Sequence, residues 1–333
     1  MKLEQMPRYP LLCGFTPLQR MENLEQALGC GPLYIKRDDL TPLGLGGNKT
    51  RKLEFLLGDA LAGGADTLVT VGGVQTNHGR LTAAAAAKAG LACTLVLDGA
   101  RPEKLSGNLL LDCLLGASLV YTDGRSTSAV IEETLAALQA AGRAPYFIPE
   151  GGSNAVGSAG YLAMVPELLA QADSLPVPPA RLVCTMGSLG TFAGLWLGAR
   201  AFGAPFSVTG VAVSPTTGYT REKAAALVNE MSAAYGLDIA AAPEDMDIIY
   251  ADAAHDYAGP GYNVPDAKTR GAVELLARTE GIFLDPCYTA KSFRGFCDIA
   301  RELDGGAIFV HTGGTPALWT QEHLDAFAAD YWN

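Results

Sequence analysis

The sequence is poor in positive charge. It contains 24 lysines and arginines against 35 aspartates and glutamates, which gives a formal net charge of -11 at pH 7. It has no run of basic residues, whereas a nucleic-acid-binding protein needs clustered Lys and Arg to displace counterions from phosphates. We therefore expect no nucleic-acid partner.

Long apolar runs are also absent. No segment has the roughly 18 uninterrupted apolar residues of a membrane span, and the first ten residues do not combine a basic start with an apolar core as a signal peptide does. The 333 residues are 49% hydrophobic and 18% charged, which is typical of a globular protein with room for two domains. We expect no membrane partner and a cytoplasmic location.

Metal-binding patterns are missing as well. The chain has seven cysteines, an odd number, and four histidines, and none of them has the C-x-x-C or Cys/His spacing of a zinc site. Cys93 and Cys184 lie in apolar runs, where cysteine behaves as a small core residue. We expect a reducing compartment and no metal.

Strand-like and helix-like patterns alternate along the chain. The strands are apolar on both sides, which is typical of a parallel sheet covered by helices on both faces. The sequence therefore predicts an α/β fold of two doubly wound, mostly parallel sheet domains, with a cleft at the carboxyl ends of the strands. The predicted strands are 33–36, 67–71, 93–97, 118–121, 146–148, 181–185, 208–213 and 307–310, and the predicted helices are one that begins at Lys49 and 77–89, 108–115, 128–141, 161–171, 191–202, 220–235, 266–279 and 289–301.

Lys49 follows Gly46, Gly47 and Asn48 and stands at the start of a helix with an apolar stripe. The helix dipole favours negative charge at this end, so an ammonium group is poorly placed there. A lysine in this position is easier to explain if it is neutral or used covalently. The alternative is an ordinary solvated lysine.

Two glycine-rich loops each leave a strand and open a helix. The loop from Gly72 to His78 has free backbone N–H groups that suit an anion such as a carboxylate, although Thr76 or Asn77 could be a plain helix cap. The loop 186–191 lets the backbone approach a phosphate. It matches neither G-x-G-x-x-G nor the P-loop, so a phosphate ligand is expected without a dinucleotide signature.

A third group of residues, 285–291 and 311–316, supplies hydroxyl groups near the expected cleft. They belong to Tyr288, Thr289 and Thr312. A partly buried tyrosine with a backbone partner is the alternative interpretation of Tyr288. A reactive lysine at one strand-to-helix junction and a phosphate cradle at another are the two attachments that pyridoxal phosphate needs.

The motifs 46–54, 72–78, 285–289 and 311–314, in order and at family spacing, resemble the D-cysteine desulfhydrase and 1-aminocyclopropane-1-carboxylate deaminase family. This family belongs to the tryptophan synthase β-like pyridoxal enzymes of fold type II. The likeness extends from Arg8 to the last strand. It implies pyridoxal phosphate as cofactor, an amino acid as substrate and a homodimer. We also expect residues 51–157 to form a smaller domain inserted in a larger one made of 1–50 and 158–333.

The resemblance also implies residue roles. Lys49, Thr76, Tyr262 and Tyr288 would be catalytic. The cofactor would be held by Lys49 through a Schiff base, by Asn48, by Asn77 at the ring hydroxyl, by Gly187, Ser188, Leu189, Gly190 and Thr191 at the phosphate, and by Thr289 or Thr312 at the pyridine nitrogen. The substrate carboxylate would bind Thr76, Asn77 and His78, with Tyr262 and Tyr288 flanking the substrate.

The threonines at 289 and 312 resemble the desulfhydrase branch, because the deaminase branch has Glu and Leu there. A hydroxyl leaves the pyridine nitrogen closer to neutral, which suffices when a good leaving group departs from the β-carbon. We therefore expect α,β-elimination of D-cysteine to pyruvate, ammonia and hydrogen sulfide, with the Lys49 pKa lowered in a desolvated site next to Arg51 and Lys52. The alternatives are L-cysteate sulfo-lyase, aminocyclopropane-carboxylate deaminase, and a non-catalytic pyridoxal or nucleotide-phosphate binder.

Two residues depart from the family pattern. Thr76 replaces a serine and adds a methyl group to the expected carboxylate site, which could shift substrate preference. Leu189 replaces a glycine of the phosphate loop, and we expect it to be tolerated if it needs no positive φ.

Overall fold

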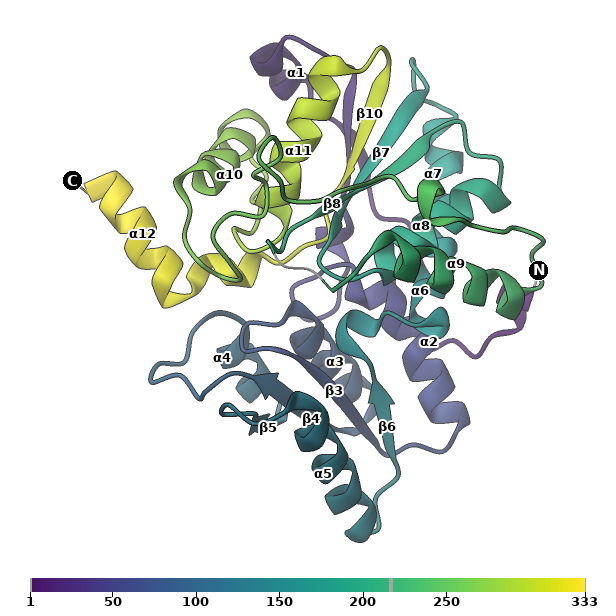
Figure 1. Ribbon diagram of the computed structural model, residues 1–333, viewed down its shortest axis with the longest axis vertical. Helices are drawn as coiled ribbons and strands as arrows, with labels where there is room; N and C mark the ends of the chain where they lie inside the picture. Colours follow the sequence, from purple (N-terminus) through teal and green to yellow (C-terminus); the bar gives the residue numbers. More distant parts are fainter. Residues whose placement is uncertain (1, 216–217, 333) are drawn as a thin grey trace.

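The computed structural model describes residues 2–215 and 218–332, which form two sheets (Figure 1). One has six strands in the order β1-β2-β10-β7-β8-β9 and the other four in the order β5-β4-β3-β6. All neighbours are parallel except β1 and β2. The prediction of an α/β fold with two mostly parallel sheets is confirmed. The strands are β1 Leu18–Arg20, β2 Leu33–Lys36, β3 Thr67–Gly73, β4 Ala92–Asp98, β5 Ser118–Tyr121, β6 Pro145–Ile148, β7 Pro179–Met186, β8 Ser207–Ala212, β9 Ile248–Ile249 and β10 Gly306–Val310.

The four-stranded sheet takes its strands from one continuous part of the chain, 67–148. The six-stranded sheet takes strands from both sides of that part. In Figure 1 the four-stranded sheet lies below the six-stranded one, and α2 Lys49–Ala62 and α3 Asn77–Ala89 lie near the junction. The exact domain limits at 51 and 157 stay a prediction.

Helices cover both faces of the six-stranded sheet. Along β10, Ile308 and Val310 join a core with α8, while Ala307 and Phe309 join a second core with α11. This alternation follows from the two-residue period of a strand, and it explains why the strands are apolar throughout. The remaining helices are α1 Glu22–Leu28, α4 Gly107–Leu114, α5 Thr127–Ala140, α6 Ala155–Leu162, α7 Met164–Ala172, α8 Gly190–Ala201, α9 Arg221–Tyr235, α10 Ala267–Glu280, α11 Thr289–Glu302 and α12 Gln321–Trp332.

Some element predictions are wrong. The helix predicted over 161–171 is two helices, α6 and α7, and the strands β1 and β9 and the helices α1 and α12 were not predicted. The start of α6 was missed because Gly157 and Gly160 break the helical pattern. Both glycines are needed, since a Cβ atom would lie 2.2 Å from the Gly152 carbonyl oxygen or from the Arg51 carbonyl oxygen. Glycine therefore permits the close approach of α6 to α2.

Within 2–215 and 218–332, no helix has both the length and the apolar character that crossing a membrane requires.

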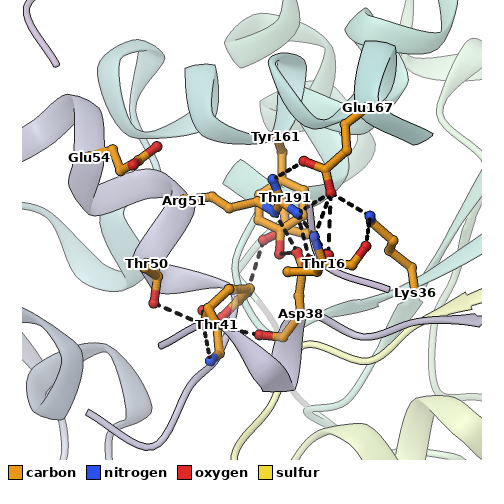
Figure 2. A network of polar contacts seen from close by, with 12 residues as sticks. Thr16, Lys36, Asp38, Thr41, Thr50, Arg51, Glu54, Tyr161, Glu167 and Thr191 are labelled. Carbon is orange, nitrogen blue, oxygen red and sulfur yellow. Dashed lines mark hydrogen bonds and ion pairs between the residues drawn. The ribbon is translucent and has the colours of Figure 1, made fainter. Parts of the chain in front are cut away.

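A buried ion network anchors the first turn of α2 (Figure 2). The Arg51 guanidinium donates to Asp38 at 2.9 Å and to Glu167 at 2.8 Å, and these side chains are at most 7% exposed. Tyr161 donates to Asp38 at 2.6 Å, and Lys36 pairs with Glu167. Burial opposes ionisation of Asp38, but the Arg51 charge and the hydrogen bonds from Arg51 and Tyr161 together lower the Asp38 pKa. The network joins α2 to the six-stranded sheet and to α6 and α7.

Candidate active site

A cavity of about 630 Å³ lies at the carboxyl ends of strands from both sheets. Its wall includes Gly73 at the end of β3, Thr185 near the end of β7 and Thr312 just after β10. The sequence predicted a cleft at this edge, because parallel strands of one sheet end on the same side.

Lys49 lies in the cavity wall as the first residue of α2. Gly46 has φ 74°, and a Cβ atom there would lie 1.9 Å from the Asp39 carbonyl oxygen, so the turn before Lys49 requires glycine. The Asn48 N–H donates to the Thr312 carbonyl and its side-chain amide donates to Thr191 Oγ1, both at 3.0 Å. These bonds tie the lysine to two other loops of the cavity.

The Lys49 amine has an unusual acidity. Burial lowers its pKa to about 8, and the Glu150 carboxylate, which also lines the cavity, opposes this effect. The predicted contribution of Arg51 is wrong, because Arg51 is occupied by Asp38 and Glu167. A pKa near 8 leaves a useful fraction of neutral amine near neutral pH, which nucleophilic chemistry requires.

Thr76 begins α3, and its hydroxyl accepts from the Gly79 N–H at 3.2 Å. Its methyl carbon lies only 2.5 Å from where a Cβ atom of Gly79 would be, so it fills space that the missing side chain leaves. Thr76 does line the cavity, but the methyl group that distinguishes it from serine packs against Gly79. The effect of this methyl on substrate preference stays a prediction.

His78 and Asn77 follow Thr76 in the cavity wall. His78 is 3% exposed, and neither of its ring nitrogens has a hydrogen-bond partner among the residues that the structure describes. Burial, together with Lys49 and Lys52, holds the His78 pKa well below its ordinary value, so the ring is neutral. A neutral imidazole offers one donor and one acceptor to a bound molecule.

The turn before α8 provides the predicted phosphate loop. Gly187, Ser188 and Thr191 line the cavity, whereas Leu189 and Gly190 do not. Leu189 has φ -78° and is 5% exposed in the core, so it needs no positive φ and its tolerance is explained. The Gly190 N–H already donates to Ser153 Oγ at 3.0 Å, which argues against its predicted role as a phosphate donor.

A polar cradle surrounds Gly190. A Cβ atom at this position would lie 2.7 Å from Lys52 Nζ and 2.9 Å from the hydroxyls of Ser153 and Ser158. The Ser158 hydroxyl has no partner within the described part of the chain. Burial, and then repulsion from Lys49, holds the Lys52 pKa well below its ordinary value. Lys52 Nζ donates to the Gly151 carbonyl at 2.9 Å, and the close approach of these polar groups explains why position 190 is a glycine.

Tyr288 and Tyr262 stand together on the cavity wall, with ring centroids 5.8 Å apart at 73°. Tyr262 also covers Gly73, because a Cβ atom there would lie 2.9 Å from its ring. Burial raises the pKa of the Tyr288 hydroxyl well above the ordinary value, and the Tyr262 pKa is raised by loss of water around its hydroxyl although the residue as a whole is 45% exposed, so both stay protonated.

Thr312 lines the cavity and Thr289 does not. Thr312 is in the cavity wall, 3.5 Å from Thr185 through their hydroxyl oxygens. Thr289 is fully buried, lies outside the wall, and donates its hydroxyl to Asp285 at 2.6 Å. The prediction that Thr289 could face the pyridine nitrogen is wrong, because Thr289 lies outside the cavity wall and its hydroxyl hydrogen bonds to Asp285.

The structure brings the other predicted residues together in one wall: Asn48, Lys49, Thr76, Asn77, His78, Gly187, Ser188, Thr191, Tyr262, Tyr288 and Thr312. Sequence reasoning missed Lys52 as a cradle residue, together with Ser153, Ser158, Thr185 and Glu150. A signal for Lys52 existed, since residues three apart on a helix share a face, so Lys52 and not Arg51 lies beside Lys49.

The family model described as pyridoxal-phosphate dependent enzyme matches residues 10–313. The chain belongs to this family. Its cofactor is pyridoxal phosphate, as the sequence motifs predicted.

Two relatives and one solved structure resemble this pyridoxal-phosphate dependent enzyme over nearly its whole length. It is 41% identical to the D-cysteine desulfhydrase of Yersinia enterocolitica serotype O:8 / biotype 1B, covering 96% of this chain and 97% of that one. It is also 41% identical to the D-cysteine desulfhydrase of Klebsiella pneumoniae subsp. pneumoniae, covering 95% and 97%. A crystal structure described as an ACC deaminase homologue superposes with a TM-score of 0.88 at 36% identity, covering 98% and 97%. The resemblance to this family is confirmed.

The cavity residues fit pyridoxal phosphate. The Lys49 amine is available for the aldehyde, and the turn at Gly187 with the hydroxyls of Ser188 and Thr191 at the start of α8 suits the phosphate. Within the described residues, no group of three or more His, Cys, Asp or Glu side chains is placed to hold a metal ion.

Uptake of pyridoxal phosphate by the cofactor-free protein is expected to depend on pH. Only the neutral Lys49 amine attacks an aldehyde, so the uptake rate should rise with pH and level off above about 8, the pKa of this amine. An ordinary lysine, with a pKa of about 10.4, would give a rate that still rises at pH 9. Stopped-flow absorbance at a series of pH values measures the midpoint, and a midpoint near 10 would contradict the lowered pKa.

Proposed function

We propose that this enzyme is a carbon–sulfur lyase that eliminates hydrogen sulfide from D-cysteine. The observation that carries the proposal is the cavity wall that combines the low-pKa amine of Lys49 with the hydroxyl of Thr312. The names of the 41% identical relatives support D-cysteine as the substrate. The overall change converts cysteine and water into pyruvate, ammonia and hydrogen sulfide.

Each cavity group has a proposed part in this reaction. Pyridoxal phosphate, when bound, draws electrons away from the substrate α-carbon. The neutral Lys49 Nζ removes the α-proton, which a pKa near 8 permits. The N–H groups at the start of α3 and the neutral His78 ring bind the substrate carboxylate. Tyr288 and Tyr262 stay protonated and donate to the departing sulfur.

The charges of the cavity argue against the sulfo-lyase alternative. A sulfonate leaving group needs extra cations. Besides Lys49, the wall contains Lys223, but it also contains the carboxylates of Asp98 and Glu150, and the Lys223 ammonium donates to the Gly218 carbonyl at 2.7 Å. Ring opening of aminocyclopropane carboxylate is the second candidate reaction, because the similar solved structure is described as an ACC deaminase homologue.

A substrate panel tests the proposed function. We expect D-cysteine to give pyruvate and sulfide in equal amounts, with a kcat/KM at least about tenfold above that of L-cysteine, L-cysteate, D-serine or aminocyclopropane carboxylate. Sulfite release from L-cysteate as the fastest reaction would identify a sulfo-lyase, and 2-oxobutyrate from aminocyclopropane carboxylate would identify a deaminase. Bound cofactor without turnover of any member would contradict an enzyme.

We also propose the finer assignments of the sequence: a homodimer, a cytoplasmic location, and a small domain of residues 51–157. The loop between β2 and α2 supports a dimer, because Leu40 and Leu45 are 52% and 58% exposed. Leu45 has φ 67°, a conformation that leucine rarely adopts. An exposed leucine in this conformation is consistent with a surface that contacts a second copy.

A further inference from the structure

A buried amide cluster lies behind the cavity wall. It consists of Gln75, Asn77, Arg80 and Asn108 and joins α3 to α4. The Arg80 and Asn108 side chains are fully buried. Of the four, Asn77 alone has a predicted role toward the cofactor ring, and Arg80 and Asn108 have none in the reaction proposed above.

Arg80 determines how both asparagine amides are oriented. A guanidinium group has donors and no acceptor, so it must face oxygen atoms. Its Nη1 donates to Asn108 Oδ1 at 2.6 Å and to Asn77 Oδ1 at 3.1 Å. Both amide oxygens therefore point toward Arg80.

Asn108 fixes the amide of Asn77 a second time. Because its oxygen faces Arg80, its NH₂ group points the other way and donates to Asn77 Oδ1 at 2.9 Å and to the Gln75 carbonyl at 2.8 Å. The Gln75 side chain in turn accepts from the Asn108 N–H at 2.8 Å. Exchanging O and N in either amide would place donors against donors and acceptors against acceptors.

The result is that the Asn77 NH₂ group is turned away from the cluster. It lies 2.9 Å from where a Cβ atom of Gly314 would be, next to Gly313 of the cavity wall. Arg80 also donates to the Gly46 carbonyl at 2.7 Å, in the turn that leads to Lys49. The buried Arg80 guanidinium thus fixes the turn before Lys49 relative to the start of α3.

We propose that Arg80 and Asn108 are positioning residues that hold the Asn77 amide with its NH₂ group toward the cavity, as a hydrogen-bond donor to the ring oxygen of the cofactor. The inference rests on the proposed function only through the identity of that cofactor. The family resemblance already implied Asn77 at the ring hydroxyl, and the inference adds that Arg80 and Asn108 set the orientation of its amide.

The variant Asn108→Asp tests the proposal with little change in shape. The new carboxylate can still accept from Arg80, but it can donate neither to Asn77 Oδ1 nor to the Gln75 carbonyl. It instead attracts the Asn77 NH₂ group and turns this amide around. The probe is 4-deoxypyridoxine 5′-phosphate, which keeps the ring hydroxyl and the phosphate but has no aldehyde to react with Lys49.

We expect Asn108→Asp to weaken binding of this probe by about tenfold to a hundredfold in calorimetric titration, as for loss of a hydrogen bond to a charged oxygen. Asn77→Ala should weaken it by a similar factor. In the Asn77→Ala background, Asn108→Asp should have no further effect, which a merely structural role would not explain. The urea midpoint of each variant checks the fold.

Two outcomes would overturn the inference. One is probe binding by Asn108→Asp within about threefold of the unchanged protein, and the other is an equal loss with and without the Asn77 amide. Failure of the proposed function is distinguishable, because probe binding needs no turnover. A protein that binds the probe and loses affinity as expected, but releases no pyruvate from any substrate, would contradict the lyase and support the positioning role.

Discussion

Replacing Lys49 by alanine is expected to lower pyruvate release by at least about a thousandfold. We propose that this amine, at the helix start in the cavity wall, holds the cofactor aldehyde covalently and also moves the α-proton. Burial lowers its pKa to about 8, which provides the neutral form that both tasks need. The variant should also lose the visible absorbance of the aldehyde–lysine linkage, measured on the purified protein.

A matched variant separates this effect from a general loss of charge. Lys104 is exposed on the loop before α4, far from the α2 start in sequence, and Lys104→Ala should keep the activity, the absorbance and the urea midpoint. Activity of Lys49→Ala above about a tenth of the original value, with visible absorbance retained, would show that another group carries the chemistry.

Replacing Arg51 by alanine is expected to lower the free energy of unfolding by about 3–5 kcal/mol. The guanidinium is 3% exposed and balances Asp38 and Glu167, which are themselves buried. Removing it leaves two carboxylates without their main partner in a medium that solvates charge poorly. Urea unfolding followed by circular dichroism measures the change.

The matched control for Arg51 is Arg125, which pairs with Glu133 at 2.8 Å but with side chains 53% and 64% exposed. Arg125→Ala should cost at most about 1 kcal/mol, because water screens and solvates an exposed pair. Equal effects of the two variants would contradict the role given to the buried network in Figure 2.

The local sequence pattern was sufficient to predict most of the helices and strands. The strand at 33–36 and the helix at 77–89 agree with the structure to the residue, because burial on both faces and a clear helix start leave an unambiguous signal. The pattern failed where packing overrode it. The glycines of α6 look like a break in sequence, yet they let that helix lie against α2.

Part of the candidate active site could also be predicted from local sequence patterns. The glycine pair before Lys49 and the loop before α8 could be recognised because a turn and a helix start have short-range requirements. The assignment of Thr289 failed although its partner Asp285 is only four residues away, because the motif alone does not show that this carboxylate accepts from both the N–H and the hydroxyl of Thr289. The contribution of Arg51 to the Lys49 pKa failed similarly, because its partners come from 13 and 116 residues away in the chain.

The sequence by itself determined the alternating α/β pattern, the family and the cofactor, because these depend on local periodicity and on short motifs. Only the tertiary structure decided which hydroxyl lines the cavity, where the methyl of Thr76 packs, and which way the Asn77 amide points. Each of these depends on how the elements pack around the cavity, even where the contacting residue is only three or four positions away, as for Thr289 with Asp285 and Thr76 with Gly79. Burial then sets the acidity of Lys49, since the loss of water around an amine is a property of the packed protein and not of the residue.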